Sequence, residues 1–305
     1  MNLLTMEHVS KAYTDRVLLD DVGFGINENE KIGVIGVNGM GKSTLLKIVA
    51  GIEESDAGTI SMGNQVKICY LPQTPVFEEG TTILRAATEG NYDELNRWTI
   101  EAEAKSMLNQ LGFTDYDEKI EHMSGGQKKR VALVRALLTP ADILVLDEPT
   151  NHLDNEMSEW LEEYLIQFRG AILMVTHDRY FLDRVVNRIV EVDHGKLYNY
   201  PGNYSEFVRL KAERQNMELA TERKRKSLLR TELEWLHRGA RARSTKQKAH
   251  IDRIHAMQEM KDIQEEKRVM LDSVASRMGN KTIELSGICK SYGEKKLIED
   301  FSYIF

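Results

Sequence analysis

The first 200 residues show short apolar runs that alternate with segments of helical spacing. Residues 31–35 have the pattern of a short apolar strand, and residues 45–50 continue with the spacing of a helix. The run at 141–146 is apolar on both faces, which favours a strand inside a sheet over one at its edge. Residues 170–175 give another apolar strand. Strands and helices in this alternation predict an α/β fold.

Residues 82–122 differ from this alternation, because helical spacing of apolar residues dominates there. This stretch predicts a small helical subdomain, at about 74–140, inserted into the first domain. A Pro-Gly pair ends that domain. We therefore expect the first domain to cover residues 1–202.

Beyond residue 202 the sequence predicts a pair of long helices. Asn203 and Glu206 supply a helix N-cap and the partner position of a capping box. An irregular apolar stripe continues to residue 236, and a second helical stretch runs from about 248 to 274. Residues 203–280 are expected to form a long antiparallel α-helical hairpin.

Composition adds mainly the uneven distribution of charge. Residues 1–204 include 19 Lys and Arg against 32 Asp and Glu, a net charge of −13. Residues 205–280 include 18 against 12, a net charge of +6. A basic segment attached to an acidic domain predicts a polyanionic partner for that segment.

Apolar runs and cysteines indicate the compartment. No run approaches the ~18 apolar residues of a membrane span, and the first residues lack the pattern of a signal peptide. Cys69 and Cys289 stand far apart, without the spacing of a metal site, which suits a reducing environment. We expect a cytoplasmic protein without a membrane partner.

A glycine-rich segment between the first predicted strand and helix carries the clearest chemistry. Residues 36–44 fit the pattern G-x-x-x-x-G-K-[ST] at every fixed position. Backbone N–H groups of such a loop and the following helix N-terminus favour phosphate oxygens. Lys42 is expected to reach the β- and γ-phosphates, and Ser43 to ligate Mg²⁺. The predicted nucleotide-binding residues of this segment are Gly36, Asn38, Gly39, Gly41, Lys42, Ser43 and Thr44.

Five more side chains fit nucleotide chemistry. Asp147 and Glu148 end a buried strand, where Asp147 would hold Mg²⁺ and Glu148 would act as general base for the attacking water. His177 ends the next strand, where it is either a structural histidine or a hydrogen-bond donor to the γ-phosphate. Gln73, at a further strand end, could touch Mg²⁺ or a water, and Tyr13 could stack on a nucleotide base. The predicted catalytic residues are Lys42, Glu148 and His177.

A turn at residues 123–127 completes a set of motifs in a characteristic order. Ser124, Gly125, Gly126 and Gln127 open a predicted helix and form a second potential anion site. In this order the motifs resemble the nucleotide-binding domain of the ATP-binding cassette (ABC) superfamily. The resemblance implies a P-loop NTPase fold of ABC type, with a mixed sheet and a helical subdomain. It also implies ATP and Mg²⁺ as cofactors.

The same resemblance divides each ATP site between two domains. In the superfamily two cassettes close head-to-tail on two ATP molecules. Residues 124–127, with Met123 in place of the usual leucine, are therefore expected to contact a nucleotide that another cassette holds. By itself, this chain is expected to bind ATP but to hydrolyse it slowly unless it homodimerises.

The end of the sequence repeats its beginning. Tyr292 matches Tyr13 at an offset of 279, and the same offset also matches a lysine, a leucine and an aspartate without gaps. We interpret residues 281–305 as the first strands of a second, truncated cassette. The alternative is a short protein that ends in an unrelated pair of strands.

The predicted hairpin has a uniformly basic tip at residues 235–250, without an acidic residue. Arginine and lysine beside Trp235 and two histidines suit phosphate contacts and base stacking. A solvated basic loop is the alternative. The expected nucleic-acid contacts are Arg238, Arg241, Arg243, Lys246 and Lys248.

Two cassettes joined by a basic hairpin resemble the ABC-F family of ribosome-associated ATPases, and the tip resembles its Uup-like branch. The resemblance implies that the hairpin contacts rRNA and tRNA on the ribosome and that the protein regulates translation. About 50 residues separate Gln73 from Ser124, too few for the arm that some members insert there. Two alternatives stay open: an accessory ATPase of DNA repair or recombination, and the ATPase subunit of a transporter.

Overall fold

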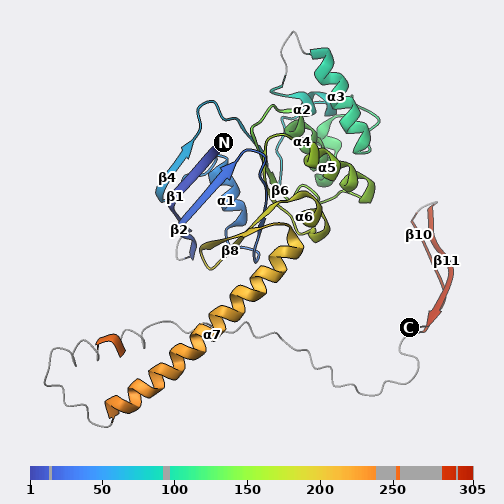
Figure 1. The fold of residues 1–305 in the computed structure, drawn as a ribbon. Coiled ribbons are helices and arrows are strands. Elements are labelled where there is room, and N and C mark those ends of the chain that lie inside the picture. The colour runs from blue at the N-terminus through green and yellow to red at the C-terminus, as the bar shows by residue number, and fades with distance from the viewer. Residues whose placement is uncertain (14–15, 92–96, 238–251, 255–283, 293–294, 305) are drawn as a thin grey trace. The chain divides into compact units, whose positions relative to one another are not determined.

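The computed structural model describes residues 1–13, 16–91, 97–237, 252–254, 284–292 and 295–304. These residues divide into two compact units, 1–220 and 221–305, which are described separately. The first unit contains two sheets and most of the helices (Figure 1).

A six-stranded sheet is the centre of the first unit. Five of its strands run parallel, and β9 is antiparallel to β8. Every residue of β6 and β7 is buried, which explains why both strands are apolar almost throughout. The predicted mixed sheet is confirmed. In spatial order the strands are β5 (Ile68–Leu71), β6 (Ile143–Asp147), β7 (Ala171–Val175), β3 (Lys31–Ile35), β8 (Arg188–Asp193) and β9 (Lys196–Pro201).

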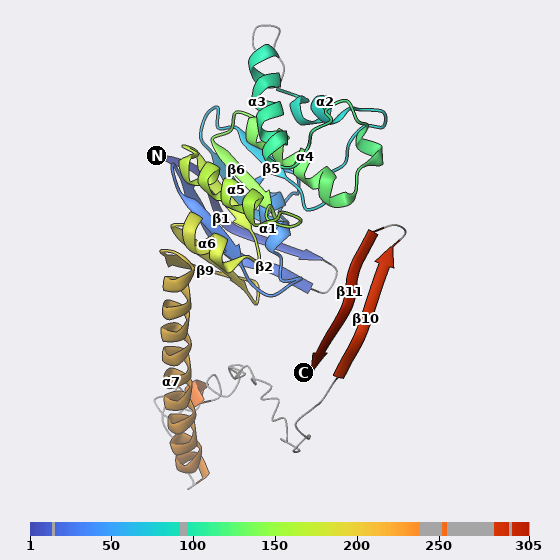
Figure 2. The same ribbon diagram turned by 90° about the vertical axis from the view of Figure 1, so that its right-hand side faces the viewer.

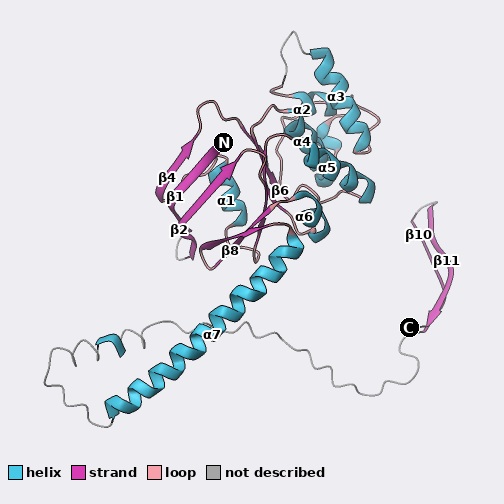
Figure 3. Ribbon diagram, in the orientation of Figure 1, coloured by secondary structure: helices cyan, strands magenta, loops and turns pink. Residues whose placement is uncertain are grey.

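A smaller antiparallel sheet and helix α1 (Lys42–Val49) share one core with the central sheet. Figure 3 shows the three strands side by side, with α1 close behind them. They lie in the order β2 (Arg16–Asn27), β1 (Asn2–Tyr13) and β4 (Ala57–Met62).

The remaining helices share a second core with the opposite face of the central sheet. Because side chains alternate along a strand, Val145 and Leu173 belong to the first core and Leu144 and Ile172 to the second. The predicted helical insertion corresponds to α2, α3 and α4. The helices and one 3-10 turn are α2 (Ile83–Thr88), α3 (Arg97–Gln110), η1 (Ile120–His122), α4 (Gly125–Leu138), α5 (Asn155–Gln167) and α6 (Arg179–Val185).

Capping side chains fix where several of these helices begin. Thr82, Ser124, Asp154 and Asp178 each accept a hydrogen bond from a backbone N–H in the first turn of α2, α4, α5 and α6. Two of these helices, α5 and α6, follow the C-terminal ends of β6 and β7. Parallel strands place those ends, together with the ends of β3 and β5, at one edge of the sheet.

Helix α7 (Tyr204–His237) begins in the first unit and continues into the second (Figure 2). Asn203 caps it as predicted, since its Oδ1 accepts a hydrogen bond from the backbone N–H of Glu206 at 3.2 Å. Residues 252–254 are helical, but the rest of the predicted second helix lies outside the described residues. None of the described helices is long and apolar enough to cross a membrane.

The second unit ends in an antiparallel hairpin of β10 (Glu284–Tyr292) and β11 (Lys295–Ile304). Its register repeats that of β1 and β2 at the offset of 279: Lys11 pairs with Leu19, and Lys290 with Ile298. All six Cα pairs between β10 and β11 obey this offset. Positive φ recurs at the same offset, in the pairs His8 and Gly287, and Asp21 and Asp300.

Candidate nucleotide-binding site

The phosphate loop joins the end of β3 to the first turn of α1. Gly36 opens it with a φ of 149°, and a Cβ at this position would lie 2.4 Å from the carbonyl oxygen of Val192. Gly41 precedes α1 with a φ of 99°. Only glycine adopts both conformations without strain. Such a backbone directs N–H groups and the N-terminus of α1 toward a phosphate.

Lys42 is the buried cation of this loop, with 8% of its surface exposed. Its Nζ donates hydrogen bonds to the carbonyl oxygens of Gly36, at 2.8 Å, and Val37, at 3.3 Å, and to Oδ1 of Asn38, at 3.1 Å. Burial lowers the pKa of Lys42, and two nearby carboxylates oppose that shift. The ammonium group therefore lies on the loop itself, where a phosphate oxygen would give it a charge-assisted hydrogen bond.

Asp147 and Ser43 supply oxygen atoms suited to Mg²⁺. Asp147 ends β6 with 2% exposure, and its Oδ1 is buried without a hydrogen-bond partner among the described residues. Burial raises the pKa of this carboxyl, and a hydrogen bond from the Ser43 side chain opposes the rise. A buried carboxylate oxygen without a partner is costly unless a cation or donor joins it. The pair therefore fits a hard cation held by oxygen ligands.

Glu148 follows Asp147 in a left-handed conformation, with a φ of 54°. It is 5% exposed, and its Oε2 is also buried without a partner in the described part of the chain. The Nε2 atom of His177 lies 3.3 Å from Oε1. Burial raises the pKa of Glu148, and His177 opposes the rise. A buried carboxylate with a raised pKa, next to a histidine, suits a general base.

Tyr13 stands at the end of β1, beside α1. Its hydroxyl donates a hydrogen bond to Glu53 and accepts one from the Thr44 side chain. The Nζ atom of Lys11 lies 5.6 Å from the ring centroid. About half of the tyrosine, 48%, is exposed. The structure thus brings an open aromatic surface next to the helix that follows the phosphate loop, where a base could stack.

The remaining predicted contacts lie on other elements. Gln73 is exposed, two residues beyond β5. The Oγ of Ser124 accepts a hydrogen bond from the backbone N–H of Gln127 at 3.3 Å, which starts α4 and leaves Gly125 exposed. A Cβ on Gly126 would meet the His152 ring at 3.0 Å. Across the described ranges no hydrogen bond joins this turn to the phosphate loop.

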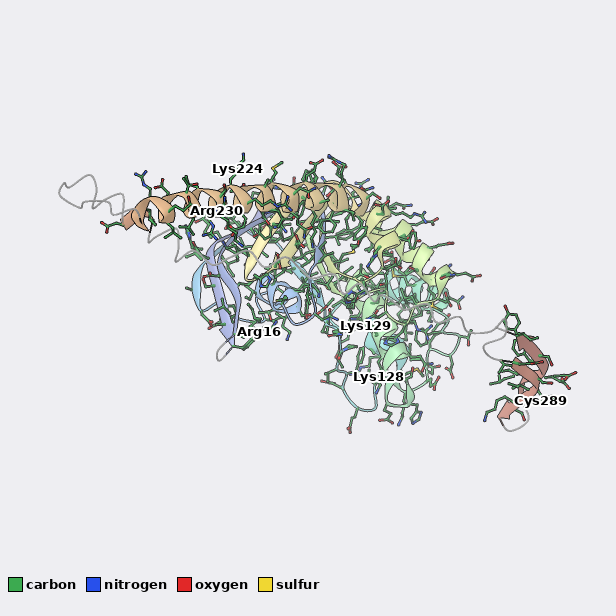
Figure 4. The ribbon with its side chains drawn as sticks, turned by 90° about the horizontal axis from the view of Figure 1, so that it is seen from below. Arg16, Lys128, Lys129, Lys224, Arg230 and Cys289 are labelled. Carbon is green, nitrogen blue, oxygen red and sulfur yellow. The ribbon has the colours of Figure 1, made fainter. Side chains whose placement is uncertain are left out.

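Lys129 is a buried residue near the site, and its position in the sequence does not indicate a role there. It is 3% exposed, and its Nζ donates hydrogen bonds to the carbonyl oxygens of Pro72 and, at 2.6 Å, of Asp147. Burial lowers its pKa to about 8. Lys128, the next residue back along α4, is only half-buried (Figure 4). Lys129 thus ties α4 to the segments that carry Gln73 and Asp147.

Arg16 is a second cation near the site, and no sequence motif indicates it. Its Nη2 donates a hydrogen bond to the sulfur of Met40 at 3.5 Å, and its Nη1 lies 3.5 Å from the position of a Cβ on Gly39. A guanidinium group therefore lies against the phosphate loop from β2 (Figure 4). The five basic residues predicted to contact nucleic acid, at 238–248, lie outside the described residues.

The comparisons with known proteins agree with this geometry. Two family models, both described as ABC transporter, match residues 19–151 and 190–272. The chain contains an ATP-binding cassette. Its ATPase domain is of the ABC type. The structure of the ATP-binding subunit of an ABC transporter is similar to it, with a TM-score of 0.59 and 27% sequence identity. That similarity covers 65% of this chain and 90% of the subunit. A dimeric cassette bound to ADP and Pi has the same fold, with a TM-score of 0.58 over 65% of this chain and 98% of its own at 23% identity.

Curated relatives match almost the whole chain. An uncharacterized ABC transporter ATP-binding protein, YfmR of Bacillus subtilis, is 41% identical over 99% of this chain and 54% of its own length. The energy-dependent translational throttle protein EttA of Mycobacterium tuberculosis is 35% identical over 99% of this chain and 61% of its own. EttA of Escherichia coli is 34% identical, over 98% and 61%. The chain therefore spans little more than half the length of these relatives.

Replacing Lys42 by Met should weaken ATP binding by about 10- to 150-fold, because a charge-assisted hydrogen bond contributes about 1.5–3 kcal/mol. Equilibrium titration with a fluorescent ATP analogue measures this effect. Lys47→Met makes the same substitution on the same helix, in its last turn, and should leave the affinity within about twofold. An equal loss in both variants would show that Lys42 has no special role at the phosphates.

Proposed function

We propose that this chain is the first part of a tandem-cassette ATPase of the ABC-F family, which acts on the ribosome. The observation that carries the proposal is the second hairpin, β10 and β11, which repeats β1 and β2 in register and in its positive-φ positions. On this proposal residues 1–202 are the first cassette, 203–280 a basic helical linker, and 281–305 the start of a second cassette.

The exposed surface of the second hairpin supports this organisation. Val9, Leu19 and Phe24 are at most 4% exposed in the first hairpin. At the offset of 279, Ile288 is 37% exposed and Ile298 42%. Apolar residues at these positions need a covering layer, and in the first cassette α1 and the central sheet supply it. The remainder of a second cassette would supply the same cover.

ATP hydrolysis in this protein would use the groups at the edge of the central sheet. Mg²⁺ would supply charge stabilisation at the phosphates, held by Ser43 and Asp147, with Gln73 as a further contact. Lys42 would bind the phosphates, Glu148 would take a proton from the attacking water, and His177 would donate a hydrogen bond to the γ-phosphate. Residues 124–127 would contact ATP held by the second cassette, so the isolated chain should turn over slowly unless it homodimerises.

The basic linker and the relatives' names support a role in translation. Relatives that match nearly the whole chain are named translational throttle proteins. The linker carries the positive charge that binding to a polyanion needs, while the cassette is acidic. We propose that its tip contacts rRNA and tRNA, and that the protein works in the cytoplasm. The uniformly basic tip favours the Uup-like branch.

Co-sedimentation of the full-length protein with ribosomes tests the proposal. A Glu148→Gln variant should pellet with ribosomes in ATP and remain in the supernatant in ADP, because retained ATP keeps the cassettes closed. Failure to pellet in ATP, with ATP binding intact, would contradict the ribosomal role.

DNA is the second candidate partner, because a basic hairpin contacts the phosphates of either nucleic acid. The same protein should then retard a structured DNA junction in a gel mobility-shift assay, at a protein concentration at which it does not pellet with ribosomes. A transporter subunit would do neither, since it works with separate membrane proteins.

A further inference from the structure

The first turns of α7 are fastened to the cassette by a buried carboxylate. Glu191, in β8, is only 3% exposed. Its Oε1 accepts a hydrogen bond from the ammonium of Lys211, and its Oε2 accepts one from Nη2 of Arg214 at 3.0 Å. Both cations belong to α7. The carboxylate therefore joins a strand of the central sheet to two successive turns of the linker helix.

Aromatic groups from β9 and α7 enclose this ion cluster. The hydroxyl of Tyr200 donates a third hydrogen bond to Glu191, at 3.0 Å to Oε2, and burial raises the pKa of that phenol, so it stays protonated. The guanidinium of Arg214 lies 3.6 Å from the ring centroid of Tyr198. Phe207 packs edge-on against Tyr200, with centroids 5.1 Å apart. The carboxylate of Glu191 is thus buried and accepts three hydrogen bonds, which gives the cluster a defined geometry.

The backbone of Glu191 is also adjacent to the residue that precedes the phosphate loop. β8 pairs in parallel with β3, and Glu191 is the partner of Ile35, the last residue before the loop. The following residue, Val192, presents the carbonyl that leaves no room for a side chain on Gly36. The phosphate loop and the carboxylate that holds α7 therefore contact two successive residues of β8.

A second connection leads from His177 to the same helix. Asp178, the next residue, caps α6. Further along α6, Oδ1 of Asp183 accepts a hydrogen bond from the backbone N–H of Ser205 at 2.7 Å. At the other end of α6, the guanidinium of Arg179 lies 5.9 Å from the ring centroid of Tyr204. The first turns of α7 thus contact β8, which lies beside the phosphate loop, and α6, which follows the histidine of the site.

We propose that Glu191 is a positioning residue that couples nucleotide binding to helix α7, through its bonds to Lys211 and Arg214 and its pairing beside the phosphate loop. A structural role alone would not require two cations on one carboxylate, since apolar packing of similar volume often stabilises a fold as well as buried ions do. Directional bonds instead fix one orientation of the helix for each position of the loop. The second family model begins at residue 190, so it contains this residue together with the helix.

Hydrogen–deuterium exchange of α7 tests the coupling in the 305-residue chain itself, without ribosomes. In a Glu148→Gln background, MgATP should change the exchange rates of amides 205–220 by about 5- to 150-fold, the usual range of coupling between two sites. Glu191→Gln should reduce this response to less than about twofold. Titration should show that Glu191→Gln still binds MgATP.

Glu222→Gln is the matched control, because Glu222 is also a buried carboxylate, with Arg225 and Lys226 as its partners within α7. It should keep the full response. Should Glu191→Gln fail to fold, Lys211→Met with Arg214→Met removes the same bonds from the helix side and should also abolish the response. A purely structural role predicts faster exchange with and without MgATP at an unchanged ratio, and that result would overturn the proposal.

The coupling does not depend on the identity of the partner, although its use in translation rests on the proposed function. Loss of ribosome pelleting with an intact exchange response would contradict the proposed function alone. An exchange response that survives in both anchor variants, with ribosome pelleting intact, would contradict the coupling alone.

Discussion

Glu148→Gln should lower the ATP turnover of the full-length protein by about two to four orders of magnitude, because it removes the general base while the shape of the site is kept. The amide has the size of the carboxylate but cannot take up the proton of the attacking water. ATP binding should persist, since Lys42 and the phosphate loop are unchanged. Phosphate release under single-turnover conditions measures the chemical step directly.

Glu162→Gln is the control for this experiment. Glu162 is a buried carboxylate too, at 6% exposure, and burial raises its pKa, but its ion pair is with Arg184 of α6 and not with a residue of the site. Turnover should stay within about threefold of the unaltered protein. If Glu148→Gln turned over as fast as this control, another group would have to be the base.

Gly36→Ala should abolish ATP binding and destabilise the fold by about 3 kcal/mol or more, because the substitution causes both backbone strain and a steric clash. The added Cβ would lie 2.4 Å from the carbonyl oxygen of Val192, in a backbone conformation that alanine rarely adopts. The neighbouring atom is backbone within β8, so it cannot move aside as the end of a side chain could. Urea denaturation and ATP titration measure the two effects.

Gly51→Ala separates strain from collision. Gly51 also has positive φ, 69°, but a Cβ there would meet no atom within 4 Å. Only the strain of about 1–2 kcal/mol should remain, with ATP affinity unchanged. Equal destabilisation by both substitutions would mean that the carbonyl oxygen of Val192 does not exclude a side chain at position 36.

Local patterns predicted those parts of the fold that depend on local order. The apolar runs at 141–146 and 170–175 correspond to β6 and β7, and the glycine spacing located the loop before α1. Ser124 caps α4 and Asn203 caps α7, where their side chains fit the first turn. Such features are readable because the interacting atoms are at most a few residues apart.

Contacts between distant residues could not be predicted in this way. Lys129 looks like any lysine after a turn, yet its hydrogen bond to Pro72 spans 57 residues. Glu191 and Arg214 are 23 residues apart on a strand and a helix, and charge alone does not indicate that they meet in a buried cluster. Only packing of α4 and α7 against the sheet brings these groups together. The repeat of the first hairpin could be predicted in part from the sequence, because four matched residues indicate the offset of 279.

The most direct test of the account compares two triple variants of the full-length Glu148→Gln protein in ribosome co-sedimentation with ATP. One changes Arg238, Arg241 and Arg243 of the predicted tip to Ala, and the other changes Arg223, Lys224 and Arg230, exposed along α7, to Ala. The charge change is the same in both. The proposed ribosomal role predicts that the tip variant loses affinity and that its salt dependence falls by about 2–3 in log–log slope, whereas the α7 variant binds nearly as the parent does. Equal binding by both variants, or no binding by the parent protein, would contradict it.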